Sequence, residues 1–274
     1  MNDKDFSRQS FLGSKSEEIL AGTRVLIAGL GGGGSHIAQQ LAHIGVGEIR
    51  LVDPDRIEPS NLNRLVGALH SDLEQSTPKI DIAVRTIHGV RPWIKTSAVM
   101  DKWQAADSLL KDAHIIFGCL DGYQQRHYLE NAARRFCLPY IDIGMDVCKI
   151  GDNAYAVAGQ MIVSKPFGPC MKCLGFINDQ RLSIEENRYG DAGIAPQVIW
   201  TNGTLASLAI GAMMKLLTPW SSFDETYTWL ELDGNAQTVT RSKQPMYMPQ
   251  HKICPHYAGP DILGDPFFRL NSPI

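Results

Sequence analysis

A glycine-rich turn between two apolar segments constrains the fold of this chain more than any other feature. The apolar run 25–28 leads into the sequence GLGGGG at 29–34, and an amphipathic segment follows it. A second apolar run then closes on Asp53. This order of strand, glycine turn, helix and strand is typical of a dinucleotide-binding βαβ unit.

The spacing of the glycines gives them separate tasks. Gly29 is expected to allow the tight turn, Gly31 to let the backbone approach a phosphate, and Gly34 to let the helix lie close to its strand. Gly32 belongs to the same loop and is placed with them in the binding site. The phosphates would lie at the amino end of the helix, and Asp53 is predicted to reach the ribose hydroxyls.

Polar residues beyond the strand ends favour ATP over the other nucleotides that such a turn binds. They are Asp55, Asn61, Arg64, Lys79 and Asp121. Amide and cationic side chains there can surround a triphosphate, and the last carboxylate can hold its Mg²⁺. A hydride-transfer enzyme needs none of them. Taken singly, Arg64 and Lys79 are more often solvated surface charges, and Asp121 is more often a helix cap; only their combination favours the site.

Alternating apolar and helical patterns predict the fold class. Apolar runs lie at 24–29, 48–53, 95–100, 114–119 and 139–143, and helical patterns near 34–44, 79–89, 103–111 and 123–136. This alternation predicts an α/β fold with a Rossmann-like, doubly wound, mostly parallel sheet.

The second half of the chain predicts antiparallel strands that extend this sheet. The runs 153–164 and 225–232 alternate apolar and polar residues, as strands with one covered face do. Between them, 178–196 is polar without clear periodicity and is expected to form a long crossing loop. A helical pattern over 197–217 predicts a buried helix.

Charge and hydropathy bound the function. The 274 residues hold 26 Lys plus Arg and 29 Asp plus Glu, which gives a net charge of −3. This balance argues against nucleic acid and against a membrane surface as partners. The start of the chain lacks the apolar core of a signal peptide, and the apolar stretch 205–217 is short and contains Lys215. We therefore expect a cytoplasmic protein.

Three of the six cysteines have the spacing of a structural zinc site. Cys170 and Cys173 form a C-x-x-C pair in a turn-rich stretch, and Cys254 is the nearest match to a third ligand. Either His251 or His256 is a candidate for the fourth ligand, and the sequence does not choose between them. The alternative is that the pair consists of ordinary turn residues. Four protein ligands would leave no open position for chemistry, so the zinc would be structural.

The combined order of these motifs resembles that of the ThiF/MoeB/HesA-type adenylyltransferases, which are related to the adenylation domains of ubiquitin-activating enzymes. The resemblance covers most of the chain and rests on the motifs DFSRQ at 5–9, the glycine loop, DPD at 53–55, N-x-x-R at 61–64, PK at 78–79, Asp121 with Arg126, the C-x-x-C pair, and GIAP at 193–196.

The resemblance implies one adenylation domain over 1–274. Residues 1–21 would form an N-terminal arm and 22–150 the nucleotide-binding part. Residues 151–274 would hold a second sheet, the crossing loop and the zinc-knuckle region. Family members use Mg-ATP to adenylate the C-terminal carboxylate of a small ubiquitin-like or sulfur-carrier protein that ends in Gly-Gly, and they commonly form homodimers.

The family's site residues map onto this sequence position by position. Asp53 would bind the ribose, while Asn61, Arg64 and Lys79 would bind the phosphates. Asp121 would bind Mg²⁺, with Leu120 beside it in the nucleotide site. Arg8 would come from the partner subunit of the homodimer and complete its neighbour's site.

The chain also departs from family members that form a thioester, because residues 174–198 contain no cysteine. We therefore predict adenylation without a thioester on this chain, with Cys148 as the exception to test. The nearest rival function is an ATP-dependent dehydratase or cyclase acting on a modified tRNA base or a peptide. An NAD-dependent oxidoreductase and an inactive binding module are the other two.

Overall fold

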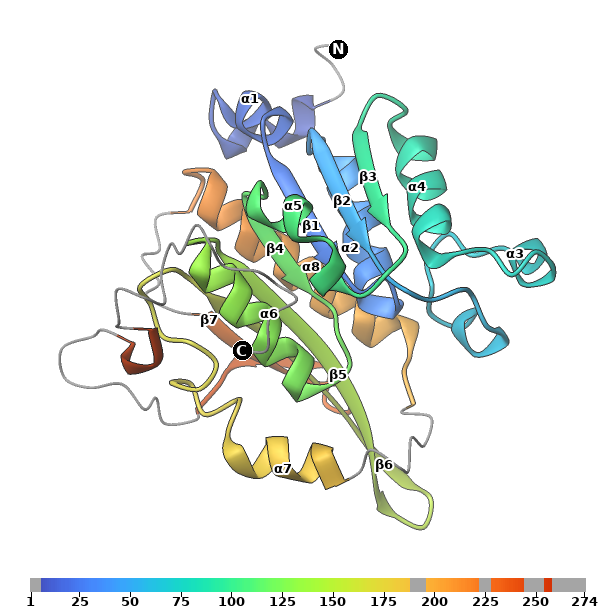
Figure 1. Cartoon of the computed structure of the whole chain (residues 1–274), viewed down its shortest axis with the longest axis vertical. Coiled ribbons are helices and arrows are strands. Elements are labelled where there is room, and N and C mark those ends of the chain that lie inside the picture. The colour runs from blue at the N-terminus through green and yellow to red at the C-terminus, as the bar shows by residue number, and fades with distance from the viewer. Residues whose placement is uncertain (1–5, 188–195, 222–227, 244–253, 258–274) are drawn as a thin grey trace.

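The computed structural model describes residues 6–187, 196–221, 228–243 and 254–257, and all strands within them belong to one sheet. Its strand order is β3-β2-β1-β4-β5-β6-β7-β8 (Figure 1). The strands are β1 (Arg24–Ala28), β2 (Glu48–Val52), β3 (Lys95–Val99), β4 (Ile115–Gly118), β5 (Tyr140–Gly151), β6 (Ala154–Ser164), β7 (Thr228–Asp233) and β8 (Thr238–Arg241).

Helices connect these strands. The α-helices are α1 (Ser16–Ala21), α2 (Gly32–Ile44), α3 (His70–Glu74), α4 (Lys79–Val90), α5 (Asp107–Lys111), α6 (Tyr123–Arg135), α7 (Asp179–Asn187) and α8 (Ile199–Leu217). Short 3-10 helices are η1 (Ser7–Leu12), η2 (Pro59–Asn61), η3 (Trp103–Ala105) and η4 (Pro255–Tyr257). Among the described helices, none combines the length and the apolar character needed to cross a membrane.

The first half of the sheet is parallel, as predicted. β1 pairs in parallel with β2 on one side and with β4 on the other, and β2 pairs in parallel with β3. The chain reverses its direction of travel across the sheet between β1 and β4. In open α/β sheets the ligand crevice lies outside the carboxyl ends of the strands at such a switch point. The fold therefore places the glycine loop, which follows β1, at the expected binding edge.

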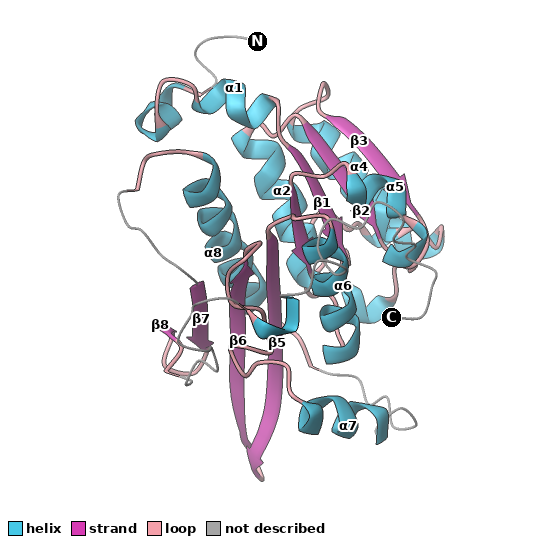
Figure 2. Ribbon diagram, turned by 60° about the vertical axis from the view of Figure 1, so that its left-hand side comes forward, coloured by secondary structure: helices cyan, strands magenta, loops and turns pink. Residues whose placement is uncertain are grey.

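The second half is antiparallel and continues the same sheet. β5 pairs in parallel with β4 over three residues but in antiparallel fashion with β6 over eleven. β7 and β8 follow in antiparallel order. Figure 2 shows β5 and β6 as a long hairpin that extends beyond the parallel strands. The strands after residue 151 thus extend the first sheet and do not form a separate second one, because β5 pairs with β4 on one side and with β6 on the other.

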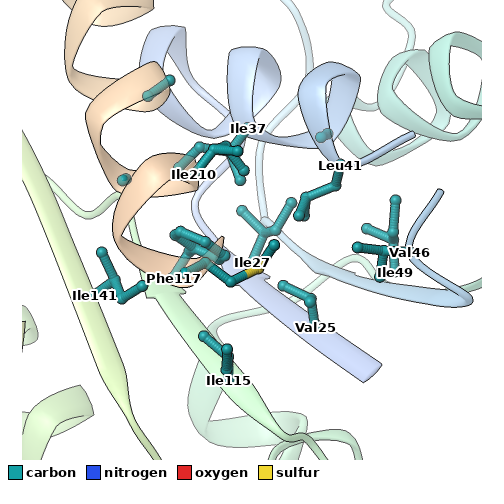
Figure 3. Packing of buried hydrophobic residues seen from close by; sticks show 14 of the residues in the cluster. Val25, Ile27, Ile37, Leu41, Val46, Ile49, Ile115, Phe117, Ile141 and Ile210 are labelled. Atoms are coloured by element: carbon teal, nitrogen blue, oxygen red, sulfur yellow. The ribbon is translucent and has the colours of Figure 1, made fainter. Parts of the chain in front are cut away.

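Both faces of the central strand β1 are covered. Val25 and Ile27 of β1 pack in one cluster with Ile37 and Leu41 of α2 and Ile210 of α8 (Figure 3). The intervening β1 residues face the opposite cluster, which α5 and α6 cover. Alternate side chains of a strand point to opposite faces, so a strand covered on both sides reads as a continuous apolar run. This explains why the sequence of β1 shows no alternation.

The crossing segment predicted over 178–196 contains the helix α7. Asn178 begins it, since its Oδ1 accepts a hydrogen bond from the backbone N of Arg181 at 2.9 Å. The Arg181 guanidinium lies over the ring of Phe176, and Leu182 packs against the core. Because α7 makes so few apolar contacts, its sequence shows no helical periodicity of apolar residues. Residues 188–195 of this segment lie outside the described part.

Two other segments differ in detail from the sequence pattern. The helical pattern at 103–111 divides into η3 and α5, which Ala106 separates with a non-helical ψ of 35°. The N-terminal arm contains η1 and α1. Phe6, only 4% exposed, lies where a β-carbon on Gly45 would be, at the carboxyl end of α2. The arm therefore packs at the opposite end of α2 from the glycine loop.

Candidate functional site

The glycine loop has the close contacts that its sequence predicted. Gly29 has a φ of +90°, and a β-carbon there would lie 2.4 Å from the carbonyl O of Cys119. A β-carbon on Gly34 would lie 1.9 Å from the carbonyl O of Gly29. The first position needs glycine because of its left-handed backbone, and the second because the helix approaches the turn too closely for any side chain.

The amino end of α2 opens toward free space on one side. Gly31 is the N-cap residue of this helix, and no described atom lies within 4 Å of the place where its β-carbon would be. The first N–H groups of a helix have no partner within the helix, and the helix dipole favours negative charge there. This end of α2 can therefore accept a phosphate group.

Asp53 connects the second strand to the glycine loop. It is 4% exposed; its Oδ2 accepts a hydrogen bond from the backbone N of Leu30 at 2.6 Å, and its Oδ1 accepts one from the backbone N of Asp55 at 2.8 Å. Burial raises the pKa of this carboxyl, while the Lys79 ammonium and the two N–H groups oppose the rise. The predicted ribose ligand is thus fixed in orientation beside the loop.

Lys79 approaches the same edge from the start of α4. Its Nζ lies 2.7 Å from Oδ2 of Asp55, and its side chain is 11% exposed whereas that of Asp55 is 60% exposed. The backbone N of Lys79 also donates to the carbonyl O of Asp55 at 3.0 Å. An ammonium has three N–H groups, so this ion pair leaves donors for a phosphate.

Arg64 lies over the amino end of α2. A β-carbon on Gly32 would be 3.3 Å from Cδ of Arg64, which places the arginine side chain against the glycine loop. Its Nη1 donates to the carbonyl O of Ser60 at 2.5 Å and to Oδ1 of Asn63 at 3.1 Å. These contacts hold the guanidinium beside the helix end.

Asn61 lies at the end of η2, in the loop that leads to Arg64. It is 7% exposed, and its Oδ1 accepts a hydrogen bond from the backbone N of Glu58 at 3.1 Å. Its Nδ2 lies 3.4 Å from Oγ of Ser60. These bonds shape the loop that carries Arg64, and the Nδ2 group retains donor capacity for a phosphate.

Asp121 follows β4, the strand beside β1. It is exposed, and its Oδ1 accepts a hydrogen bond from Nε2 of Gln197 at 3.4 Å. The N-cap of the following helix α6 is Gly122, and the backbone N of Gln124 in its first turn donates to Oε2 of Glu185 at 2.9 Å. Capping therefore does not explain Asp121. Leu120, also predicted for the nucleotide site, packs within 3.5 Å of a β-carbon placed on Gly29.

Arg8 is not brought to this site within one chain. It lies in η1 and is exposed, two residues after Phe6, whose side chain packs at the carboxyl end of α2. The 13 residues of α2 span about 20 Å, and the glycine loop lies at the other end. A role for Arg8 in nucleotide binding would therefore require a second copy of the chain, as the resemblance implied.

Two buried polar groups near this edge escaped the sequence analysis. Asn202 of α8 is 5% exposed, and its Nδ2 would lie 2.4 Å from a β-carbon on Gly32. Asp142 of β5 is fully buried, where its Oδ2 accepts a hydrogen bond from Nη1 of Arg126 at 2.5 Å and its Oδ1 one from the Tyr140 hydroxyl at 2.8 Å. Neither residue belongs to a motif, so only the fold reveals them.

The predicted thiols do come together, with His256 among them. The sulfur of Cys173 lies 3.7 Å from that of Cys170 and 3.4 Å from that of Cys254. Nδ1 of His256 lies 3.4 Å from the sulfurs of Cys170 and Cys173 and 3.8 Å from that of Cys254. The other candidate, His251, lies outside the described residues.

The dimensions of this cluster fit a tetrahedral metal ion. Zn–S bonds of about 2.3 Å require sulfurs about 3.8 Å apart, close to the distances among these thiols. All four ligand atoms lie within 4.8 Å of one another. Hydrogen bonding among the three thiols lowers the pKa of Cys254 and raises the pKa of Cys170 and of Cys173.

Helix α6 holds the loop that carries the first two thiols. The buried Glu130 accepts a hydrogen bond at Oε1 from the backbone N of Met171 at 2.9 Å. Arg134, also buried, donates to the carbonyl O of Gly168 at 2.9 Å and to that of Pro169 at 2.8 Å. The Cys170 loop is therefore fixed in place by its backbone, independently of its sulfur atoms.

A Rossmann-like sheet with a glycine loop, an acidic residue after the second strand and two cations at the switch point defines a nucleotide-binding α/β domain. Residues 6–255 match the ThiF family, and the chain belongs to that family. This agrees with the resemblance found in the motifs.

Named relatives in this family are adenylyltransferases and related activating enzymes. The chain is 30% identical over 166 residues to the SAMP-activating enzyme E1 of Haloferax volcanii, covering 60% of this chain and 57% of that enzyme. It is 28% identical over 230 residues to the sulfur carrier protein ThiS adenylyltransferase of Escherichia coli, covering 80% and 86%. It is 26% identical over 260 residues to the vegetative HesA protein of Trichormus variabilis, covering 92% and 89%.

The match spans only part of some relatives. It covers 57% of the Haloferax enzyme and 42% of the adenylyltransferase and sulfurtransferase uba4 of Aspergillus fumigatus, to which the chain is 30% identical over 220 residues.

Solved structures show the same fold. Escherichia coli MccB in complex with MccA-N7isoASN matches with a TM-score of 0.73 and 19% identity, over 93% of this chain and 75% of that chain. MccB with ATP matches with a TM-score of 0.66 and 21% identity, over 92% and 75%. At this identity the likeness concerns the fold alone.

Proposed function

We propose that this protein uses ATP to adenylate the C-terminal Gly-Gly carboxylate of a small ubiquitin-like or sulfur-carrier protein, with release of pyrophosphate. The observation that carries the proposal is the arrangement at the β1–β4 switch point. Arg64 lies on the amino end of α2, Lys79 enters from α4, and Asp121 follows β4. The relatives named after ThiS and SAMP supply the substrate class.

The step itself forms one bond and breaks one. A carboxylate oxygen of the carrier attacks the α-phosphorus of ATP, and the bond from that phosphorus to the oxygen bridging the α- and β-phosphates breaks. Pyrophosphate leaves with the bonding electron pair, and the carrier carries an acyl-adenylate. A carboxylate is ionised at neutral pH, so this reaction needs no general base.

Charge neutralisation is the main task of the site, because an anion must approach an anion. Arg64 and Lys79 would stabilise charge on the α-phosphate and on the departing pyrophosphate. The amino end of α2 would fix the phosphates, and Asp53 would orient the ribose. Asn61 would donate its free amide N–H to a phosphate while shaping the loop of Arg64.

Asp121 is the residue that would hold Mg²⁺. Its carboxylate is exposed at the strand end and caps no helix, and its one hydrogen bond within the described residues is the 3.4 Å contact with Gln197. Carboxylate oxygen suits Mg²⁺ as a ligand. When bound, the ion supplies additional positive charge against the phosphates.

The active unit would be a homodimer. Arg8 lies at the far end of α2 from its own glycine loop and is exposed. A second copy would place Arg8 at the nucleotide site of its neighbour, so each subunit would complete the other's site.

The thiol cluster would hold a structural Zn²⁺ through Cys170, Cys173, Cys254 and Nδ1 of His256. Its distances suit tetrahedral coordination, and a fourth protein ligand leaves no place for a reacting molecule. The ion would fasten the segment of Cys254 to the loop beside α6.

We further propose that no thioester forms on this chain. Cys148 is exposed in β5. It lies six residues beyond Asp142, the β5 residue that pairs with the last residue of β4, and six residues correspond to about 20 Å along the strand. Its sulfur donates to Oδ2 of Asp146 at 3.3 Å. An external thiol or a conjugating partner would complete the pathway.

ATP–pyrophosphate exchange by the purified protein tests the proposal directly, because exchange reports reversible acyl-adenylate formation. We expect exchange only when a particular small Gly-Gly-ending protein is added from a panel. The same carrier without its last two glycines is the control. ATP binding without exchange for any carrier would overturn the proposed substrate class and favour a peptide or a modified base.

A further inference from the structure

The first turn of α8 is polar where the rest of its buried face is apolar. From Leu205 onward the buried residues of α8 are apolar, and they pack against α2. Thr201 and Asn202, one turn earlier, are 1% and 5% exposed. Burying an amide in a helix interface costs free energy unless the amide has hydrogen-bond partners. Packing alone therefore does not explain an asparagine at this position.

The Asn202 amide occupies the space that Gly32 leaves empty. A β-carbon on Gly32 would lie 2.4 Å from Nδ2 and 2.8 Å from Cγ of Asn202. In an α-helix the Cα–Cβ bond points toward the amino end. Since Gly32 is the first residue of α2, Nδ2 of Asn202 lies beside the end of the helix where a phosphate would bind. Arg64 reaches the same place, with its Cδ 3.3 Å from that β-carbon position.

This amide has an unused donor. An asparagine side chain carries two N–H donors on one nitrogen. Within the described residues, the side chain of Asn202 makes one hydrogen bond, from Nδ2 to the carbonyl O of Val198 at 3.0 Å. One N–H of the group at the amino end of α2 is thus available to an acceptor that enters the site.

We propose that Asn202 is a phosphate-positioning residue, which donates its second Nδ2–H to a phosphate oxygen of ATP bound at the amino end of α2. The inference rests on the proposed function and adds a residue from a distant helix to its nucleotide site. Glycine is required at position 32 because any side chain there would displace the amide and crowd Arg64.

Asn202 would also connect the nucleotide to the segment that enters α8. Val198, which accepts its hydrogen bond, follows Gln197. The carbonyl O of Gln197 accepts a hydrogen bond from Nδ2 of Asn63 at 3.1 Å, and its side chain reaches Asp121 at 3.4 Å. One residue therefore joins the phosphate end of α2 to a segment that the proposed Mg²⁺ ligand also contacts.

The test compares three variants in the full-length protein by titration calorimetry with Mg²⁺ and the α,β-methylene analogue of ATP, which cannot be cleaved at the reacting bond. Asn202→Ala removes the donor, and we expect its dissociation constant to rise about tenfold or more, since a hydrogen bond to a charged group is lost. Asn202→Asp keeps the shape but adds a negative charge, so we expect a larger rise.

Thr201→Val is the matched control, because it removes a buried hydroxyl from the same turn while keeping the side-chain shape. The Thr201 Oγ1 has no hydrogen-bond partner within the described residues, so affinity for the analogue should stay at the wild-type value. Exchange kinetics supply a second readout. A positioning role raises the KM for ATP and leaves the KM for the carrier unchanged, whereas a structural role lowers Tm and affects both substrates.

The outcomes separate this inference from the proposed function. Wild-type exchange with a carrier, together with unchanged analogue affinity in Asn202→Ala and Asn202→Asp, would overturn the inference alone. A wild-type protein that binds no ATP would overturn both. If Asn202→Ala does not fold, the shape-preserving Asn202→Asp still decides, because it would bind the analogue normally were the amide remote from the phosphates.

Discussion

The nucleotide edge and the thiol cluster are assembled in opposite ways. The nucleotide edge is the surface formed by the glycine turn, α2 and Asp53. All of it lies within residues 29–53, and backbone groups make the surface that would bind the nucleotide. The thiol cluster joins Cys173 to Cys254, which are 81 residues apart, and its ligand atoms all belong to side chains. The first site is therefore a property of local geometry. The second exists only when two distant segments have been brought together.

Removing one thiol should have the largest effect on stability, because it removes a ligand from the cluster that joins two distant segments. In Cys170→Ser we expect loss of bound metal and a fall of about 5 kcal/mol in the free energy of unfolding, the range typical of a lost structural metal. Metal content by mass spectrometry and denaturant unfolding measure the two effects.

Cys148→Ser provides the control for this substitution, since that thiol is exposed and distant from the cluster. It should retain the metal and the wild-type stability. A wild-type protein that is free of metal and as stable as its Cys170→Ser variant would show that these cysteines are ordinary buried residues of a turn.

At the nucleotide edge, the cations should affect turnover without affecting folding. Arg64→Ala and Lys79→Ala are each expected to reduce carrier-dependent exchange by about 10²- to 10³-fold, as removal of a transition-state charge partner does. Lys95→Ala, which removes an exposed lysine paired with Glu48 at the far end of β2, should leave exchange unchanged. Normal turnover in both site variants would remove them from the site.

Substitutions at two glycines of the loop test whether close backbone contact shapes the nucleotide edge. Gly34→Ala places a methyl group 1.9 Å from a carbonyl oxygen and should destabilise the protein by about 3 kcal/mol. Gly31→Ala meets nothing within 4 Å, so its free energy of unfolding should stay near the wild-type value while its affinity for ATP falls. Equal stability of the two variants would contradict the described approach of α2 to the turn.

A smaller, pH-dependent effect is expected near the thiol cluster. Burial, together with Lys172 and His256, lowers the pKa of His127 from 6.5 to about 4. The native state therefore holds this histidine neutral. The contribution of His127 to the free energy of unfolding is fully present above pH 6.5 and is lost as the pH drops toward 4. From this group alone we expect a loss of about 2 kcal/mol between pH 7 and 5.

Urea unfolding of the wild type and of His127→Phe at pH 7 and pH 5 measures this contribution. The variant should lose less stability on acidification than the wild type does. Parallel losses in the two proteins would show that His127 is protonated equally in the folded and unfolded states.

The difference between the two regions also decides what the sequence can predict. The glycine loop and the place of Asp53 were predictable because strand, turn and helix are contiguous, and their spacing fixes their geometry. The three thiols were predictable from their spacing, whereas the closeness of His256 to them required the folded positions. Asn202 gave no signal, because an asparagine in an apolar helix has meaning only beside Gly32. The helix α7 was missed for lack of periodicity.

The unequal pairing of β5 has a consequence for the order of folding. Its antiparallel register with β6 extends over eleven pairs across a short connection, while its parallel register with β4 covers three residues and joins segments further apart in sequence. Hairpins close within about 1–10 μs, whereas parallel pairing must first offset the entropy of a long loop. We expect the β5–β6 hairpin to acquire amide protection first, and the nucleotide edge to be completed late.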